Sequence, residues 1–245
     1  MMILNCRTPE DALQSVADIL SIPKETIAWD LDSVDFEKQY EDSGAWREYD
    51  FGEFLFRYFI STYSVCTQVL RIDRVYWFHL SRTLTPDCFA EGIYPLDQAL
   101  EKIHMGMMKR FGTLGVPVWE ETHFTHDKER QGPFAMLVRE IAFRASQVSN
   151  HDYLEIPEYI EDHFSEEVVR EFKQQAVPVV AQFFAEPDRP VETYLKRVFE
   201  YLYCCYQKKD FWIGGCNTCY DGKGTAVPAE QMISIEVIER QRGQQ

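Results

Sequence analysis

Apolar residues recur at helical spacing along much of the chain. After Thr8-Pro9, a pair typical of a helix start, Ala12, Val16 and Ile19 fall on one side. We therefore expect residues 1–70 to be mainly helical. The same spacing predicts further helices over 49–65, 97–111, 134–147, 165–176 and 191–207.

Shorter apolar runs, one of them with alternating polar positions, predict strands over 75–78, 153–156, 177–184 and 232–238. In the last of these, Ile233, Ile235 and Val237 fall on one face, and Ser234 and Glu236 on the other. We expect an α+β fold with a split antiparallel or mixed β core flanked by helices. Its two parts are expected to be a helical N-terminal region (1–70) and an α+β domain (71–245).

Residues 75–96 are the stretch with the clearest signals for where local elements begin and end. Thr85 precedes Pro86 at the expected start of a short helix, where a capping hydroxyl and a missing N–H are both favourable. Gly92 stands where a left-handed cap would end that helix. The stretch therefore predicts a strand, a polar turn, a short helix and a glycine stop.

The charge balance limits the partners. The chain of 245 residues has a formal net charge of −15, and residues 1–70 hold five Lys and Arg against thirteen Asp and Glu. Because phosphate contacts need clustered cations, a protein partner is favoured over nucleic acid. Most such acidic faces are simply solvated, and a docking surface for a basic partner is the second interpretation.

The chain offers no membrane span and no signal peptide, since its apolar runs are short and its N-terminus turns acidic at once. Its seven cysteines, an odd number, do not form a secreted disulfide pattern. We therefore expect a cytoplasmic protein without a membrane partner.

The sequence around the candidate metal-binding and redox residues does not support either kind of site. Cys216 and Cys219 have the spacing of zinc and redox motifs but lack a second pair, so we interpret them as incidental. His123 and His126 lie among carboxylates in a polar loop, which displays such residues by composition alone. No metal site is expected. Phosphate-loop, dinucleotide-binding, nucleophile-elbow and HExxH motifs are absent from the sequence.

The cluster His79-Leu80-Ser81-Arg82 is the strongest candidate for a ligand-binding site. By strand alternation His79 and Ser81 share a face, and Arg82 follows. An imidazole and a hydroxyl suit a ribose diol, and a guanidinium suits a pyrophosphate. The alternative interpretation is that these side chains form a buried network with a purely structural role.

The segment FHLSR…CFAEGIYPL resembles the NAD-gripping strand of ADP-ribosyltransferases, in which a strand ends in H-x-[ST] before a short helix and a Gly-Ile step. The resemblance implies that residues 71–245 bind NAD as a substrate, that His79 and Ser81 hold its ribose and that Arg82 contacts phosphate. It also implies that Glu236, on a late strand, is catalytic. Tyr94 or Tyr153 would stack on nicotinamide, and Tyr94 is nearer in sequence to the cluster.

Two other functions stay open. The chain is a non-catalytic interaction module if its acidic N-terminal helices dock a partner protein. A weaker alternative is a metal-dependent hydrolase that uses the histidines and carboxylates. The acceptor of any ADP-ribose cannot be identified from the residues.

Overall fold

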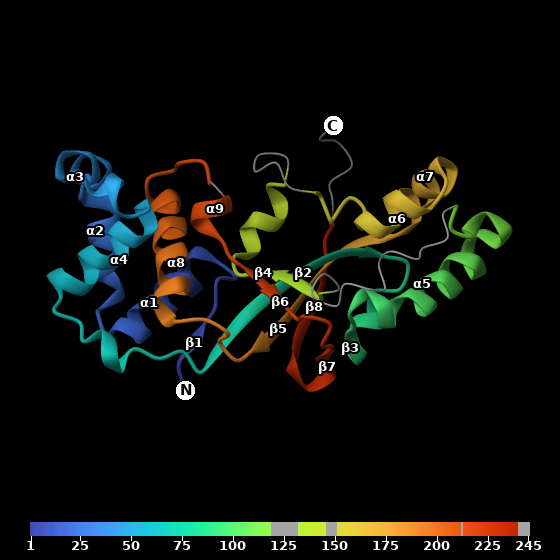
Figure 1. The fold of residues 1–245 in the computed structure, drawn as a ribbon, viewed down its shortest axis with the longest axis horizontal. Helices are drawn as coiled ribbons and strands as arrows, with labels where there is room; N and C mark the ends of the chain where they lie inside the picture. The colour runs from blue at the N-terminus through green and yellow to red at the C-terminus, as the bar shows by residue number, and fades with distance from the viewer. Residues whose placement is uncertain (119–131, 146–150, 212, 240–245) are drawn as a thin grey trace. The chain divides into compact units, whose positions relative to one another are not determined.

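The computed structural model describes residues 1–118, 132–145, 151–211 and 213–239 (Figure 1). The expected α+β class is confirmed, with a mixed sheet and helices around it. The chain divides into two compact units. The first unit comprises Met1–Trp77, Met136–Arg144 and Phe184–Thr218, and the second comprises the rest. Residues 1–70 thus lie within a unit that also takes in two later segments.

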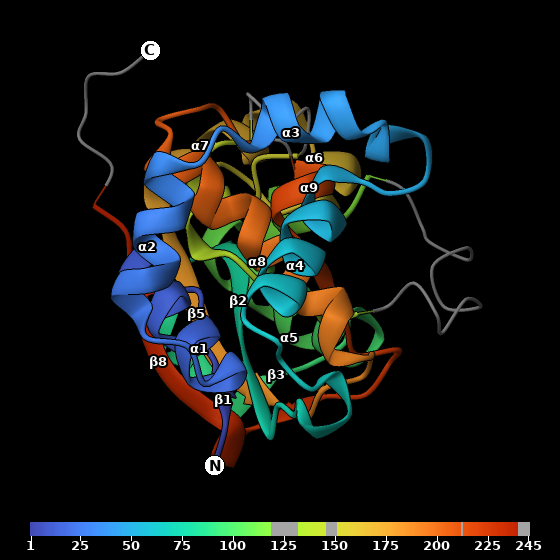
Figure 2. The same ribbon diagram turned by 90° about the vertical axis from the view of Figure 1, so that its left-hand side faces the viewer.

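The first unit is mainly helical. Its helices are α1 (Pro9–Leu20), α2 (Lys24–Ser33), α3 (Phe36–Ser43), α4 (Phe51–Thr62), α8 (Val191–Tyr206) and α9 (Ile213–Cys216), with 3₁₀ turns η1 (Ala45–Arg47), η2 (Thr67–Val69) and η6 (Arg139–Phe143). Helices α4 and α8 lie side by side (Figures 1 and 2). Between them Phe59 stacks on Phe199, with ring centroids 4.6 Å apart. Stacked rings and buried apolar area hold this core together.

The six-stranded sheet has the order β6-β4-β2-β5-β8, and β1 pairs with β2 in parallel. Its strands are β1 (Ile3–Leu4), β2 (Arg74–Thr83), β4 (Phe134–Met136), β5 (Val177–Ala185), β6 (Cys219–Asp221) and β8 (Met232–Val237). Strands β5 and β8 are antiparallel. A separate antiparallel pair joins β3 (Gly92–Ile93) to β7 (Val227–Pro228).

The second unit has its own apolar cluster between three helices. These are α5 (Leu96–Phe111), α6 (Glu158–His163) and α7 (Glu166–Gln175), seen together in Figure 1. Met107, Ile160 and Phe172 are buried there, one from each helix. The remaining 3₁₀ turns are η3 (Pro86–Glu91), η4 (Gly112–Gly115) and η7 (Ala229–Gln231). All residues of this cluster belong to the second unit.

Most expected elements are confirmed, but residues 134–147 are a wrong prediction. Instead of a helix, residues 134–136 form strand β4 and residues 139–143 form the 3₁₀ turn η6, while residues 146 and 147 lie outside the described residues. The apolar residues have helical spacing, yet β4 gains hydrogen-bonded neighbours on both sides, β6 and β2. Pairing with distant strands overrides a weak local preference.

The strand expected over 153–156 is also wrong, because the segment is a turn. The Asp152 carboxylate accepts the N–H groups of Leu154 (3.0 Å) and Glu155 (3.1 Å), and these bonds bend the chain locally. The helix expected after Pro157 does form, as α6.

The short helix after Thr85 differs in detail. It is the 3₁₀ helix η3, and the Thr85 side chain makes no capping bond. Gly92 has a φ of 110° with an extended ψ, so it is not a left-handed helix cap. A Cβ there would lie 2.3 Å from the Val227 carbonyl oxygen, so close strand pairing requires glycine.

In the part of the chain that the structure describes, none of the helices combines the length and the apolar character needed to cross a bilayer.

Candidate functional site

His79 lies in the second half of β2 and is half-buried. Its Nδ1 is 2.7 Å from the carbonyl oxygen of Phe134 on β4. Because a carbonyl oxygen only accepts, Nδ1 carries the proton and Nε2 is the acceptor of the neutral ring. The neighbouring strand therefore sets the tautomer of this histidine.

The pKa of His79 reinforces that assignment. Burial lowers the pKa from its ordinary value of 6.5, and the hydrogen bond to Phe134 opposes this shift only in part. The ring is therefore neutral at pH 7. A neutral imidazole with Nε2 as acceptor suits a hydroxyl donor, such as a sugar hydroxyl, better than an anion.

Glu236 lies on β8, the strand at one edge of the described sheet, and β5 lies between β8 and β2. Its register partner on β5 is Val180, and two residues earlier Ser234 faces Gln182. The Ser234 hydroxyl donates to the Gln182 side-chain oxygen at 3.2 Å. Glu236 therefore shares its face of the edge strand with a polar pair, and it is half-buried there.

The 3₁₀ turn η3 follows β2 in the chain and contacts residues of both β2 and β8. Its Phe89 ring lies 5.6 Å from the His79 ring, and η3 also packs against β8. The family resemblance implies ribose binding by His79 and catalysis by Glu236, and both residues lie on strands that η3 contacts. Ser81, two positions after His79, is half-buried on the same strand.

Arg82 is held by the main chain. Its guanidinium donates to the carbonyl oxygens of Leu154 (3.1 Å) and Lys173 (2.5 Å). These bonds join β2 to the turn before α6 and to the end of α7. The geometry gives Arg82 a bracing role, which differs from the phosphate contact that the family resemblance implies.

The two tyrosines proposed for stacking have separate surroundings. The Tyr94 ring lies under Lys102, with Nζ 4.4 Å from the ring centroid. The Tyr153 hydroxyl donates to Glu158 at 3.3 Å, and its ring contacts His151. Burial raises the pKa of Tyr153 to about 12. Neither tyrosine has a described ring contact with His79, whereas Phe89 does.

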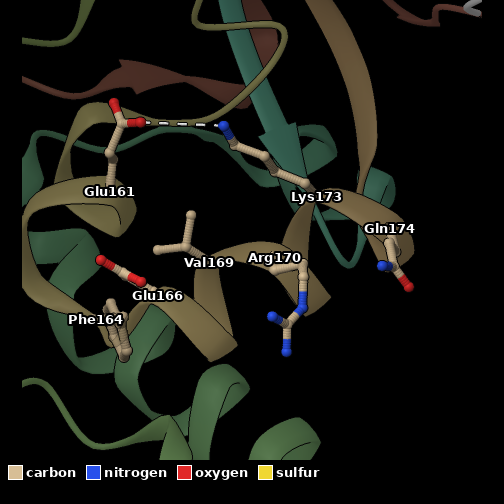
Figure 3. Close-up of a pocket in the computed structure, with 7 residues that line it drawn as sticks. All are labelled: Glu161, Phe164, Glu166, Val169, Arg170, Lys173 and Gln174. Carbon is tan, nitrogen blue, oxygen red and sulfur yellow. Dashed lines mark ion pairs between the residues drawn. The ribbon is translucent and has the colours of Figure 1, made fainter.

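A surface cavity of about 460 Å³ lies on α6 and α7 (Figure 3). In it Glu161 and Lys173 point toward each other, 4.0 Å apart, and the Arg170 guanidinium points away from that ion pair. Lys173 also pairs with Glu155 at 2.9 Å. The cavity holds charges of both signs, and it is lined by none of the residues singled out in the sequence.

A second cavity, of about 340 Å³, lies in the first unit between segments 19–23 and 63–70. Its walls are mixed, with apolar side chains such as Ile19 and Leu70 beside the polar Ser21 and Ser64. It too contains none of the expected site residues.

The remaining expectations concern metals. His123 and His126 lie outside the described residues. Within the described ranges, no group of three or more His, Cys, Asp or Glu has the arrangement of a metal site. Cys216 is buried in the first unit, and Cys219 is exposed on β6.

Sequence reasoning missed Phe89 and Phe134 as neighbours of His79. Phe89 lies inside the segment FHLSR…CFAEGIYPL. An aromatic residue in the short helix after the cluster of His79 to Arg82 was a usable signal. Phe134 gave no signal in the sequence, because it contacts His79 through its main-chain carbonyl group. Comparisons with family models, curated proteins and solved structures find no significant match to this chain.

Proposed function

We propose that the second unit binds NAD at the β2–η3–β8 face and transfers ADP-ribose from it. The observation that carries the proposal is the packing of η3 against both His79, through Phe89, and the strand of Glu236. Since β5 lies between β2 and β8, a ligand that contacts both residues would have to extend across β5.

The roles follow from the chemistry of each group. His79 accepts a ribose hydroxyl through Nε2, because Nδ1 is committed to Phe134. Ser81 contributes a second hydroxyl contact. Glu236 accepts the ribose 2′-OH and stabilises the positive charge that develops on the sugar as nicotinamide leaves. Tyr94, Tyr153 and Phe89 are the candidates for stacking on nicotinamide, and Phe89 is favoured by its contact with His79.

Arg82 is left out of the phosphate contact in this proposal, since two carbonyl oxygens already accept from it. The acceptor of ADP-ribose is proposed to be a protein, because the net charge of −15 disfavours a broad nucleic-acid surface.

Glu236→Gln tests the catalytic role. The variant should keep its circular dichroism spectrum and release nicotinamide from NAD about 10²–10³-fold more slowly, because one charge-stabilising group is lost. Glu230→Gln is the matched control, an exposed carboxylate in the turn just before β8. Equal nicotinamide release by wild type and Glu236→Gln would remove the catalytic assignment.

Binding is tested separately. A ligand that binds only the folded state raises its melting temperature by mass action, so millimolar NAD should stabilise the wild type. His79→Ala should weaken that shift, and Glu236→Gln should largely keep it. An unchanged melting temperature at millimolar NAD would overturn the NAD proposal.

A second candidate function is protein docking by the first unit. Trp29 on α2 is 65% exposed and Trp46 on η1 is 56% exposed. On the helix surface Trp29 has Glu25 and Asp32 as its i−4 and i+3 neighbours. An exposed tryptophan beside carboxylates suits a partner that is both apolar and basic.

A lysine- and leucine-rich amphipathic peptide tests the docking function. It should change the tryptophan fluorescence in a salt-sensitive way, and Trp29→Ala should reduce the affinity. A peptide response that is the same in wild type and Trp29→Ala would exclude Trp29 from the surface.

A further inference from the structure

Two buried thiols meet in the first unit. The Cys204 Sγ near the end of α8 and the Cys216 Sγ of α9 are 3.8 Å apart, and Cys216 donates to Cys204. Cys204 is 9% exposed and Cys216 is fully buried. The sequence gives no sign of this pair, because twelve positions and a change of direction separate the two residues.

The contact is fixed at a second point, one helical turn away. Glu200 precedes Cys204 by four residues on α8, and Gly215 precedes Cys216. A Cβ on Gly215 would lie 1.8 Å from Glu200 Oε1, so α9 packs closely against this face of α8. The two helices therefore meet in one register, which places the sulfurs together.

The chain after Cys216 is also held. The Asn217 side-chain oxygen accepts the N–H groups of Leu137 (3.0 Å) and Val138 (3.1 Å). The next carbonyl group, that of Thr218, accepts from Leu137 at 3.0 Å. These bonds hold the chain that follows Cys216 in place, and so keep the Cys216 sulfur beside the Cys204 sulfur.

The neighbouring cysteines differ in reactivity. The hydrogen bond from Cys216 lowers the pKa of Cys204, against the opposing effect of burial. Burial raises the pKa of Cys205 to about 12. Since the thiolate is the reactive form, Cys204 is the better nucleophile of the adjacent pair.

We propose that Cys204 and Cys216 form a reversible disulfide when a hydroperoxide oxidises the chain. The Cys204 thiolate attacks one peroxide oxygen, the O–O bond breaks, and the departing oxygen takes the thiol proton to give water (an alcohol for an organic peroxide). The resulting sulfenic acid is attacked by the Cys216 sulfur. Its S–O bond breaks, an S–S bond forms, and the departing hydroxide leaves as water with the Cys216 proton.

In sum, two thiols and hydrogen peroxide give one disulfide and two waters. This modification site is independent of the proposed NAD chemistry. A disulfide needs about 2.05 Å between sulfurs, so the pair must close by less than ~2 Å. It would tie α9 to α8 and close a short loop, and we expect it to raise the melting temperature by roughly 5 °C or more.

The full-length chain, reduced and then treated with hydrogen peroxide, tests the proposal. After denaturation the number of alkylatable thiols should fall from seven to five, and a peptide map should join 204 to 216. Dithiothreitol should restore all seven. The melting temperature of the oxidised chain should exceed that of the reduced chain.

Variants assign the partners. Cys205→Ser and the exposed-site control Cys66→Ser should keep the crosslink, whereas Cys204→Ser and Cys216→Ser should lose it. Cys216→Ser should instead trap a sulfenic acid that reacts with dimedone. The proposal is overturned if the wild-type map joins other cysteines, if Cys205→Ser abolishes the crosslink, or if the crosslink forms only in urea.

Discussion

Glu200 in the first unit and His79 in the second are both titratable side chains whose pKa is shifted by burial, but their surroundings differ. Gly52 and Gly215 border the Glu200 carboxylate so closely that neither position has room for a Cβ. Within the described part of the chain, His79 makes its hydrogen bond through one ring nitrogen, Nδ1, and its strand is half-buried along this section.

The difference separates two uses of a buried polar group. In the first unit, close packing fixes the Glu200 carboxylate. This carboxylate therefore affects the stability of the fold and the pH dependence of that stability. In the second unit, one hydrogen bond orients the imidazole and makes Nε2 the acceptor nitrogen, which the proposed function pairs with a ribose hydroxyl. Four tests of this contrast follow, from the largest expected effect to the smallest.

The first test replaces a glycine in each unit. A Cβ on Gly52 would lie 2.4 Å from the Lys196 carbonyl oxygen, whereas a Cβ on Gly106 in α5 meets nothing within 4 Å. Gly52→Ala should lower the free energy of unfolding by about 3 kcal/mol through overpacking. Gly106→Ala should raise it by up to ~1 kcal/mol through helix propensity. Urea denaturation measures both, and effects of the same sign would contradict the contrast in packing.

The second test concerns pH. Burial, assisted by Asp50, raises the pKa of Glu200 to about 7 from 4.5. The folded state therefore holds this proton more tightly, so its stabilising effect is complete below pH 4.5 and is lost as the pH rises to about 7. The loss amounts to roughly 3 kcal/mol.

Glu200→Gln removes this titration. Relative to wild type, the variant should gain about 3 kcal/mol of unfolding free energy at pH 8 compared with pH 4. Denaturant curves at both pH values measure the difference. Parallel pH profiles for the two proteins would show that Glu200 titrates normally.

The third test asks whether Arg82 braces the second unit. Arg82→Lys cannot reproduce two divergent N–H donors, so it should cost about 2 kcal/mol of unfolding free energy. Arg170→Lys on the exposed face of α7 is the matched control, with an expected change within about 0.5 kcal/mol. An Arg82→Lys variant with full stability but a raised KM for NAD would restore the phosphate contact.

The smallest effects concern helix caps, one in each unit. The Thr8 hydroxyl accepts from Asp11 N–H at 3.1 Å, and the Ser165 hydroxyl accepts from Val168 N–H at 3.4 Å. Replacing either by Ala should cost about 1 kcal/mol or less, with the larger loss at Thr8 because its bond is shorter. Amide hydrogen exchange locates each loss in α1 or α7. A larger loss at Ser165 would reverse this ranking.

The sequence by itself determined the elements whose signals are local. Thr8-Pro9 and Ser165 begin α1 and α7 as expected, and the long periodic runs became α5 and α8. The alternating pattern of the last strand predicted β8, with Glu236 and Ser234 on one face. Caps and periodicity act within one turn or one strand, so they can be read from neighbouring residues.

Only the tertiary structure decided the features that depend on partners far along the chain. Residues 134–136 became a strand because other strands flank them, and Ile3–Leu4 pairs with the start of β2. Arg82 was assigned to a phosphate, yet its acceptors are carbonyl groups 72 and 91 positions away. Hydrogen-bond acceptors on the main chain exist at every residue, so the sequence does not mark which of them a side chain will reach. The turn before α6 and the end of α7 bring these two carbonyl groups to Arg82, and only the folded chain places them there.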